Sequence, residues 1–205
     1  MNYSKLEEKK ERIGDWQETY TGKFWALDPK IEDVSLRDIA HALSQICRFV
    51  GHTKHFYSIA QHCLNVYKVL ESQGYDEKIQ LMGLLHDASE AYACDIPSPL
   101  KRCLPEYKKV ENKIEEVIYS AFGIEHTDED KKIIKSADVL VLLNEAAVLM
   151  NNTDNWIYNY GYEPCNIDTS LRDMKTVEGE YFSSTIKLIK RKRKRKNKSI
   201  LIKSK

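Results

Sequence analysis

The chain has 205 residues, with 32 Lys and Arg against 31 Asp and Glu, so its formal net charge is +1. Residues 190–205 contain 10 of these basic residues and no acidic one, which leaves 22 basic and 31 acidic residues, a net charge of −9, in residues 1–189. An acidic body argues against nucleic acid as the main ligand, because phosphate backbones are contacted by basic surface. The length favours one domain, residues 1–189, followed by a basic and flexible tail, residues 190–205.

The sequence offers no membrane-spanning helix, which needs about 20 consecutive apolar residues. The N-terminal segment MNYSKLEEKKER is too charged for a secretory signal peptide. The five cysteines are odd in number and form no C-x-x-C pair. This usage is typical of free thiols in a reducing compartment, so we expect a cytoplasmic protein without cysteine-bound zinc.

Helical patterns follow one another along the chain, and the predicted fold class is all-α. Ser35 and Asp38 have the spacing of a capping box, Gly74 and Gly123 end apolar periodicities, and Pro105 opens one. Residues 20–25 are the one expected extended segment. The predicted helices span about residues 35–46, 57–72, 76–93, 105–122, 127–143 and 168–189.

The stretch GLLHDASEAYACDIPSPLK, which starts at Gly83, places ionisable residues at the end of an apolar helix. His86 and Asp87 are adjacent, and Glu90 is four residues after His86, so His86 and Glu90 share one face if the helix continues. Burying such groups is costly unless they are paired or bind a metal. Imidazole and carboxylate groups are ligands for divalent ions, so the stretch indicates part of a metal site.

Two residues on other predicted helices can complete this site. His62 lies among apolar residues in YSIAQHCLNV, and Asp138 is the acidic residue of the apolar segment KSADVLVLL. An His-Asp dipeptide is by itself a weak signal. From residue types alone, His62 is equally well a core histidine that bonds a carbonyl, and Asp138 an exposed carboxylate on an amphipathic helix.

With these residues in view, the sequence resembles the HD-domain metal-dependent phosphohydrolases. The resemblance covers about residues 21–150 and is greatest to the 5′-deoxynucleotidase-like branch and its phage relatives that hydrolyse deoxynucleoside triphosphates, through HDASE and DIPSPLK. It implies a helical bundle with a metal site between helices, whose ligands are His62, His86, Asp87 and Asp138. It further implies one divalent transition metal, which N/O ligation allows to be Mn, Co, Fe, Ni or Zn.

The resemblance also assigns catalytic roles to two carboxylates. Glu90 matches the glutamate that positions or deprotonates the attacking water, and Asp95 matches an aspartate of substrate binding or proton delivery to the leaving oxygen. The alternative for Glu90 is a charge on a surface helix. His52 and His55 form an H-x-x-H on a predicted loop, and we expect them to line the pocket or to be structural while the site remains mononuclear.

Four residues are implied by the same resemblance to bind substrate. Lys101 and Lys135 match phosphate-binding lysines, although lysines are usually solvated. Arg48 and Phe49 match an arginine that holds phosphate and an aromatic ring that packs on the base. Phe49 stands where the family has tryptophan, with a different spacing to His62, which leaves base preference open. Arg48 could instead stabilise the C-terminus of the predicted helix before it.

The expected function is hydrolysis of a nucleotide by water attack at the α-phosphorus. A 5′-deoxynucleotidase acting on deoxynucleoside monophosphates is favoured over a triphosphohydrolase that releases triphosphate. A non-catalytic nucleotide-binding module is a further alternative, and DIPSPLK argues against an alarmone or cyclic-nucleotide hydrolase. We expect a homodimer, no membrane partner, and a tail that is dispensable for catalysis, with nucleic-acid contact through the tail as the less favoured alternative.

Overall fold

The computed structural model describes residues 12–153 and 163–203, with side chains described through Arg195. It confirms the all-α class, because helices dominate and the described strands form one antiparallel hairpin of β1 (Gln17–Glu18) and β2 (Lys23–Phe24). The helical elements are η1 (Ile31–Asp33), α1 (Leu36–Gln45), η2 (Arg48–Gly51), α2 (Ile59–Ser72), α3 (Glu77–Leu85), α4 (Glu90–Ala93), α5 (Ser98–Lys101), α6 (Pro105–Ala121), α7 (Asp128–Leu149) and α9 (Met174–Lys203).

Helix α2 lies at the centre of the fold and packs against α1, α3, α7 and α9. Its apolar residues are almost fully buried, as expected for a helix that is covered on several sides. At the closest approach of α2 and α3, a Cβ atom on Gly83 would lie 2.3 Å from Cδ1 of Leu70. A larger residue at this position would therefore push against Leu70 where the two helices meet. Helix α2 contains His62, and α3 ends next to His86.

Most start and stop signals of the sequence act as predicted, and the box expected for Ser35 and Asp38 forms only in part. The Ser35 hydroxyl accepts the Asp38 amide, and Thr127 and Asp130 form a reciprocal capping box at the start of α7. Gly74 and Gly123 take positive φ angles after α2 and α6. Asp38 does not complete its own box: its carboxylate accepts bonds from Thr19 and Thr21 and thereby fastens the β-hairpin to α1.

Four boundary predictions are wrong. The helix predicted over 127–143 continues to Leu149 as α7. The predicted helix over 76–93 is interrupted, because α3 ends at Leu85 and the chain passes through tighter i to i+3 turns before α4. The backbone at His86 and Ser89 stays right-handed, so hydrophobic periodicity could not reveal this change. The last helix begins at Met174 rather than at 168. In the expected extended segment, residues 20–22 form a bend and residues 23–24 form β2.

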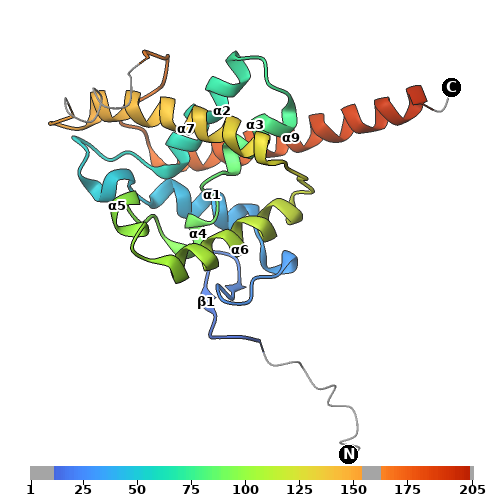
Figure 1. The fold of residues 1–205 in the computed structure, drawn as a ribbon, viewed down its shortest axis with the longest axis horizontal. Helices are drawn as coiled ribbons and strands as arrows, with labels where there is room; N and C mark the ends of the chain where they lie inside the picture. The colour runs from blue at the N-terminus through green and yellow to red at the C-terminus, as the bar shows by residue number, and fades with distance from the viewer. Residues whose placement is uncertain (1–11, 154–162, 204–205) are drawn as a thin grey trace, which may run out of the picture.

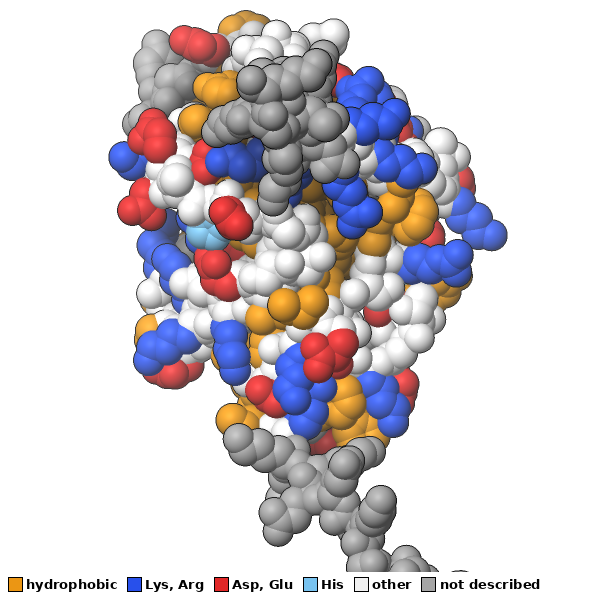
Figure 2. All heavy atoms as spheres, turned by 90° about the vertical axis from the view of Figure 1, so that its right-hand side faces the viewer, with side chains coloured by type: hydrophobic (Ala, Val, Ile, Leu, Met, Phe, Trp, Pro, Cys, Tyr) orange, Lys and Arg blue, Asp and Glu red, His pale blue; other side chains and the backbone are white. Residues whose placement is uncertain are grey.

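Helix α9 continues without a break across the predicted boundary at residue 190 and extends beyond the rest of the fold (Figure 1). Lys192 Nζ donates to the Gly123 carbonyl at 2.5 Å, and Arg195 pairs with Glu77 at 2.9 Å. Figure 2 views this end of the molecule and shows Lys and Arg side chains interleaved with Asp and Glu. The side chains beyond Arg195 lie outside the described part of the chain. The flexibility of the tail and the formation of a homodimer stay predictions.

In the described segments, no helix combines the length and the apolar character needed to cross a membrane.

Candidate metal and active site

The structure brings together the four residues predicted as metal ligands. His62 comes from α2, His86 and Asp87 from the turn after α3, and Asp138 from α7. The Nε2 atom of His62 lies 3.2 Å from His86 Nε2 and 3.2 Å from Asp138 Oδ1. The Nε2 atom of His86 lies 3.2 Å from Asp87 Oδ2. His62, His86 and Asp87 alone already form a group that could hold a metal ion.

The hydrogen bonds of the two Nδ1 atoms show which way the Nε2 atoms of His62 and His86 face. His62 Nδ1 lies 2.9 Å from a carboxylate oxygen of Glu145, and His86 Nδ1 lies 2.8 Å from the carbonyl of Gly83. Carboxylate and carbonyl oxygens only accept, so each Nδ1 carries the proton and donates. In the neutral rings, both Nε2 lone pairs then face each other and the carboxylates of Asp87 and Asp138. A divalent cation between them would satisfy this set of acceptors, so the residues fit a metal ion.

The electrostatics of the cluster are consistent with this fit. Burial alone would lower the pKa of His86, but the Asp87 carboxylate raises it well above its ordinary value. Burial would raise the pKa of Asp138, but hydrogen bonding to His62 and the charges of His86 and Lys135 lower it well below. Negative charge thus concentrates at this position, and a bound metal ion would compete there with protons on the histidines.

Glu90 lies in α4 beside the cluster and is 5% exposed. Within the described residues its Oε2 atom is buried without a hydrogen-bond partner. Burial, followed by the charges of Asp87 and Asp95, raises the pKa of Glu90 well above its ordinary value. Lys101 Nζ lies 3.7 Å from Oε1 of Glu90 and 2.7 Å from Glu111. A nearly buried carboxyl with a free oxygen is suited to exchange a proton.

Asp95 is the first residue of the DIPSPLK segment, which follows α4. Its predecessor Cys94 has a φ angle of 71°, a conformation that residues other than glycine seldom adopt. The Tyr107 hydroxyl donates to the Cys94 carbonyl at 2.6 Å and helps to keep this turn in place. Burial raises the pKa of Asp95, although Arg48 and Lys101 act in the opposite direction.

Arg48 does not cap α1, which ends at Gln45, but opens η2. Its guanidinium lies 3.3 Å from Asp87 and 3.4 Å from Glu145, and it is centred 5.4 Å from the ring centroid of Phe49. The structure therefore favours a role of Arg48 at the cluster over one at a helix end. The ring of Phe49 accompanies it on a backbone with a positive φ angle of 53°.

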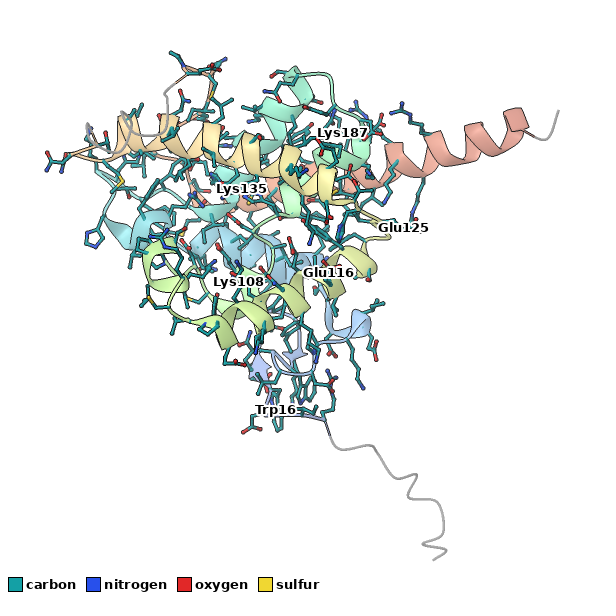
Figure 3. All side chains as sticks on the ribbon, viewed as in Figure 1. Trp16, Lys108, Glu116, Glu125, Lys135 and Lys187 are labelled. Atoms are coloured by element: carbon teal, nitrogen blue, oxygen red, sulfur yellow. The ribbon has the colours of Figure 1, made fainter. Side chains whose placement is uncertain are left out.

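Lys135 is one turn before Asp138 on α7, and its Nζ lies 2.6 Å from Asp138 Oδ2 while its side chain is 71% exposed. Figure 3 labels Lys135 on α7 and Glu116 on α6, the two helices that border this side of the site. Lys131, on the same face of α7, pairs with Glu115 at 3.3 Å and with Glu116 at 2.9 Å. The lysines around the site are thus already paired with carboxylates.

Two cavities open beside the cluster, and His86, Asp87 and Glu115 line both. One of about 130 Å³ is bordered by Glu90 and Lys101, and the other of about 200 Å³ by Lys131 and Lys135. Sequence reasoning missed Glu111, Glu115 and Lys131 because charged residues on the amphipathic helices α6 and α7 look like ordinary surface residues.

Glu145 is a further functional candidate that sequence reasoning missed. The signal was present in the sequence: a glutamate within the apolar run VLVLLNEAAVL, two helical turns after Asp138. In the structure its side chain is fully buried and contacts His62.

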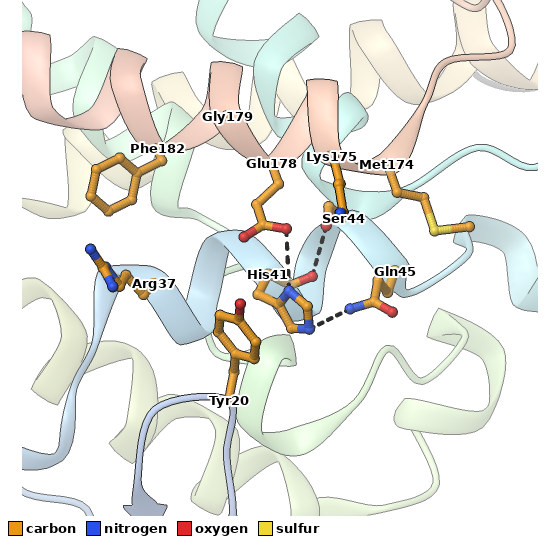
Figure 4. Close-up of a pocket in the computed structure, with 10 residues that line it drawn as sticks. All are labelled: Tyr20, Arg37, His41, Ser44, Gln45, Met174, Lys175, Glu178, Gly179 and Phe182. Carbon is orange, nitrogen blue, oxygen red and sulfur yellow. Dashed lines mark hydrogen bonds and ion pairs between the residues drawn. The ribbon is translucent and has the colours of Figure 1, made fainter.

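A larger hollow of about 610 Å³ lies elsewhere, between α1 and the start of α9 (Figure 4). In it, Tyr20 stacks on His41, which contacts Glu178 and Gln45. It shares no lining residue with the two cavities at the cluster, so volume does not locate the chemistry here. His55 is bonded through Nε2 to the Thr169 carbonyl at 2.9 Å, which is a structural contact.

Comparison with known proteins adds to this geometry. No protein-family model matches the chain. The uncharacterized protein YfdR of Escherichia coli is 45% identical over 129 residues, which make up 62% of this chain and 68% of YfdR. An uncharacterized protein of Rhodobacter capsulatus is 31% identical over 139 residues, 64% of this chain and 71% of that protein. A 5′-deoxynucleotidase of Vibrio atlanticus is 28% identical over 176 residues, 77% of this chain and 84% of that enzyme.

The helical fold with its His-His-Asp cluster is compatible with the HD class of bundles. The chain belongs to the same family as YfdR. It is more distantly similar to proteins named 5′-deoxynucleotidase.

Proposed function

We propose that this protein is a metal-dependent hydrolase of nucleotide phosphoester bonds, and specifically a 5′-deoxynucleotidase that converts deoxynucleoside monophosphates to nucleosides and phosphate. One observation carries the proposal: four acceptor groups from three parts of the chain converge on one position, and Glu90 lies beside it with an unpartnered oxygen. Relatives named 5′-deoxynucleotidase support it.

His62, His86, Asp87 and Asp138 would hold the metal, for which their N/O donors suit Mn, Co, Fe, Ni or Zn. A divalent metal supplies Lewis-acid polarisation of a phosphoryl oxygen and a lowered pKa for water. The chain's own residues supply the remaining functions of the site.

In its ionised form, Glu90 takes the proton of the attacking water through its free Oε2 atom, and the raised pKa makes this carboxylate a stronger base. Asp95 delivers a proton to the leaving 5′-oxygen, for which its raised pKa is favourable. Lys101, Lys135 and Arg48 neutralise charge on the phosphate, which is the main task of a site for phosphoryl transfer. Phe49 supplies an apolar surface for the nucleoside. Each role is part of the proposal.

The charges around the cluster favour a monophosphate over a triphosphate. Lys101, Lys131 and Lys135 are each already within ion-pair distance of a carboxylate, so few unpaired cations remain for a long phosphate chain. The cavities of about 130 and 200 Å³ are each smaller than the range of about 300–1,000 Å³ for small-molecule sites. A triphosphate brings more negative charge and more volume than this arrangement accommodates.

The test is a product assay on the full chain. The protein is stripped of metal, reconstituted singly with Mn²⁺, Co²⁺, Mg²⁺ or Zn²⁺, and offered deoxy- and ribonucleoside mono- and triphosphates. Free phosphate from deoxynucleoside monophosphates, only with added metal, is the expected result. Nucleoside plus intact triphosphate would replace the proposal with a triphosphohydrolase. Nucleotide binding without any product would replace it with a binding module.

A further inference from the structure

Glu145 lies behind the metal-ligand cluster and is 0% exposed. Two hydrogen bonds and one ion pair, from separate parts of the chain, reach its carboxylate, and Arg48 Nε itself has no hydrogen-bond partner in the described structure. Tyr57 donates its hydroxyl to Oε1 at 2.7 Å, His62 Nδ1 lies 2.9 and 3.0 Å from the two oxygens, and Arg48 Nε lies 3.4 Å from Oε2. Burying a carboxylate costs several kcal/mol unless such partners compensate. The complete burial of the Glu145 carboxylate therefore indicates a function that an exposed charge would not serve.

The partners fix the direction of every proton in this network. Asn65 donates to the Tyr57 oxygen at 2.7 Å, so the Tyr57 proton points to Glu145. The carboxylate accepts only, so the His62 proton is on Nδ1 and the Nε2 lone pair faces the other ligands. Rotating the His62 ring would break this bond and leave the buried carboxylate with the Tyr57 hydroxyl as its remaining hydrogen-bond donor, beside the ion pair with Arg48.

The same carboxylate also fixes Arg48. The guanidinium spans Glu145 and Asp87, so its position is determined on one side by Glu145 and on the other by a metal ligand. Asp138 and Glu145 are two turns apart on α7 and share one face. Helix α7 thus supplies both a ligand and the group that orients the ligand contributed by α2.

We propose that Glu145 is a positioning residue that sets the ring of His62 and the guanidinium of Arg48 in one arrangement around the metal position. The inference rests on the metal-dependent function proposed above. A ligand histidine whose outer nitrogen is fixed by a carboxylate is pre-oriented and more basic, which raises metal affinity.

The first test is Co²⁺ binding to metal-free Glu145→Gln, measured by calorimetry and by the visible spectrum of the bound ion. Glutamine keeps the shape but offers one acceptor oxygen instead of two and removes the charge that Arg48 faces. We expect the Co²⁺ affinity to fall about 10- to 100-fold and the spectrum to change.

Asn144→Ala is the matched control. Asn144 is the preceding residue on α7, is also buried, and bonds the backbone of Glu163 and Cys165 rather than a metal ligand. This variant is expected to lose thermal stability and to keep the wild-type Co²⁺ affinity and spectrum. Equal loss of affinity in both variants would show a merely structural role and overturn the proposal.

Wild-type affinity and spectrum in a folded Glu145→Gln would overturn the positioning role alone. A wild-type protein that binds no metal would overturn the proposed function together with it. If Glu145→Gln does not fold, histidine side-chain NMR of the Zn²⁺-loaded wild-type protein decides. A proton on His62 Nδ1 with metal at Nε2 supports the proposal, and metal at Nδ1 overturns it.

Discussion

At the scale of single residues, a substitution of Glu90 distinguishes an enzyme from a nucleotide-binding module. Its Oε2 atom has no hydrogen-bond donor in the described structure, and a pure binding module has no use for such a group. We expect Glu90→Gln to lower kcat by about 10²–10⁴-fold, the usual contribution of a general acid or base. The Co²⁺ affinity should stay near that of wild type, because Glu90 is not among the four proposed ligands. Steady-state kinetics and calorimetry measure the two quantities.

The control for this variant is Glu106→Gln, on the exposed side of α6, where Glu106 pairs only with Lys109 in the described contacts. It should behave as wild type. Unchanged turnover in Glu90→Gln would remove Glu90 from the reaction and support the nucleotide-binding alternative.

The predicted site residues were found because their types conflict with their surroundings. His62 and Asp138 are polar groups in apolar helices, and His86 and Asp87 end another, so the sequence indicated partners without showing the distances. Resemblance to a family then joined the four. Glu145 is likewise a charged residue in an apolar helix. Its partners, Tyr57 and His62, are identified only by the three-dimensional network.

At the scale of elements, the approach of α2 and α3 depends on Gly83. A Cβ atom there would lie 2.3 Å from Leu70 Cδ1 and 3.4 Å from Val66 Cγ1. Leu70 is fully buried, so it has little freedom to move. We expect Gly83→Ala to cost about 1–3 kcal/mol by overpacking, partly offset by the about 1 kcal/mol that alanine gains over glycine in a helix. Denaturant unfolding measures the net loss.

Gly179→Ala on α9 is the matched substitution with the opposite expected sign. A Cβ atom at Gly179 meets nothing within 4 Å, so the helix-propensity gain remains unopposed. If Gly83→Ala proved as stable as Gly179→Ala, the close approach of α2 and α3 would not constrain the fold.

The start of α7 gives a pH-dependent contribution to stability. Partial burial alone would raise the pKa of Asp130, but bonds from Lys78 and Thr127 lower it below its ordinary value. A lowered folded-state pKa stabilises the fold above the unfolded pKa of about 3.9, and this stabilisation is lost as the pH falls through the folded value. Asp130→Asn should therefore lower Tm at pH 7, with a gap to wild type that narrows below about pH 3.9.

Thermal unfolding from pH 7 to pH 3 measures this gap. Glu129→Gln, which removes an exposed pair with Lys132, serves as the control and should show little difference from wild type at any pH. A constant gap for Asp130→Asn across this range would contradict an ionic origin and leave only the shape of the capping box.

The elements themselves were largely predictable, because caps such as Thr127 with Asp130 and stops such as Gly123 act locally. The break of the helix after Leu85 could not be predicted. Turns with i to i+3 bonds keep a right-handed backbone, and the apolar pattern continues through them. The start of α9 was placed early because Asp168 resembles a cap. In the fold its carbonyl instead accepts bonds from Gln61 and Asn65 on α2, which no local pattern shows.

At the scale of the whole molecule, charge is divided between an acidic body and a basic end on α9. The described contacts of this end lie away from the metal cluster: Lys192 bonds the Gly123 carbonyl, and Arg195 pairs with Glu77. Exposed ion pairs contribute about 0–1 kcal/mol each, and fields from exposed charges fall off over about 8 Å at physiological salt. The basic end is therefore expected to add little to stability and little to the rate.

Deleting residues 190–205 should accordingly leave kcat/KM for a deoxynucleoside monophosphate unchanged at physiological salt. Tm should fall by no more than a few degrees, since about 1 kcal/mol shifts Tm by about 2–4 °C in a chain of this size. Circular dichroism and the phosphate-release assay measure both quantities on the truncated and full-length chains. If turnover of the free nucleotide disappeared while the helical fold persisted, the basic end would act in catalysis, and the site between α2, α3 and α7 would be incomplete without it.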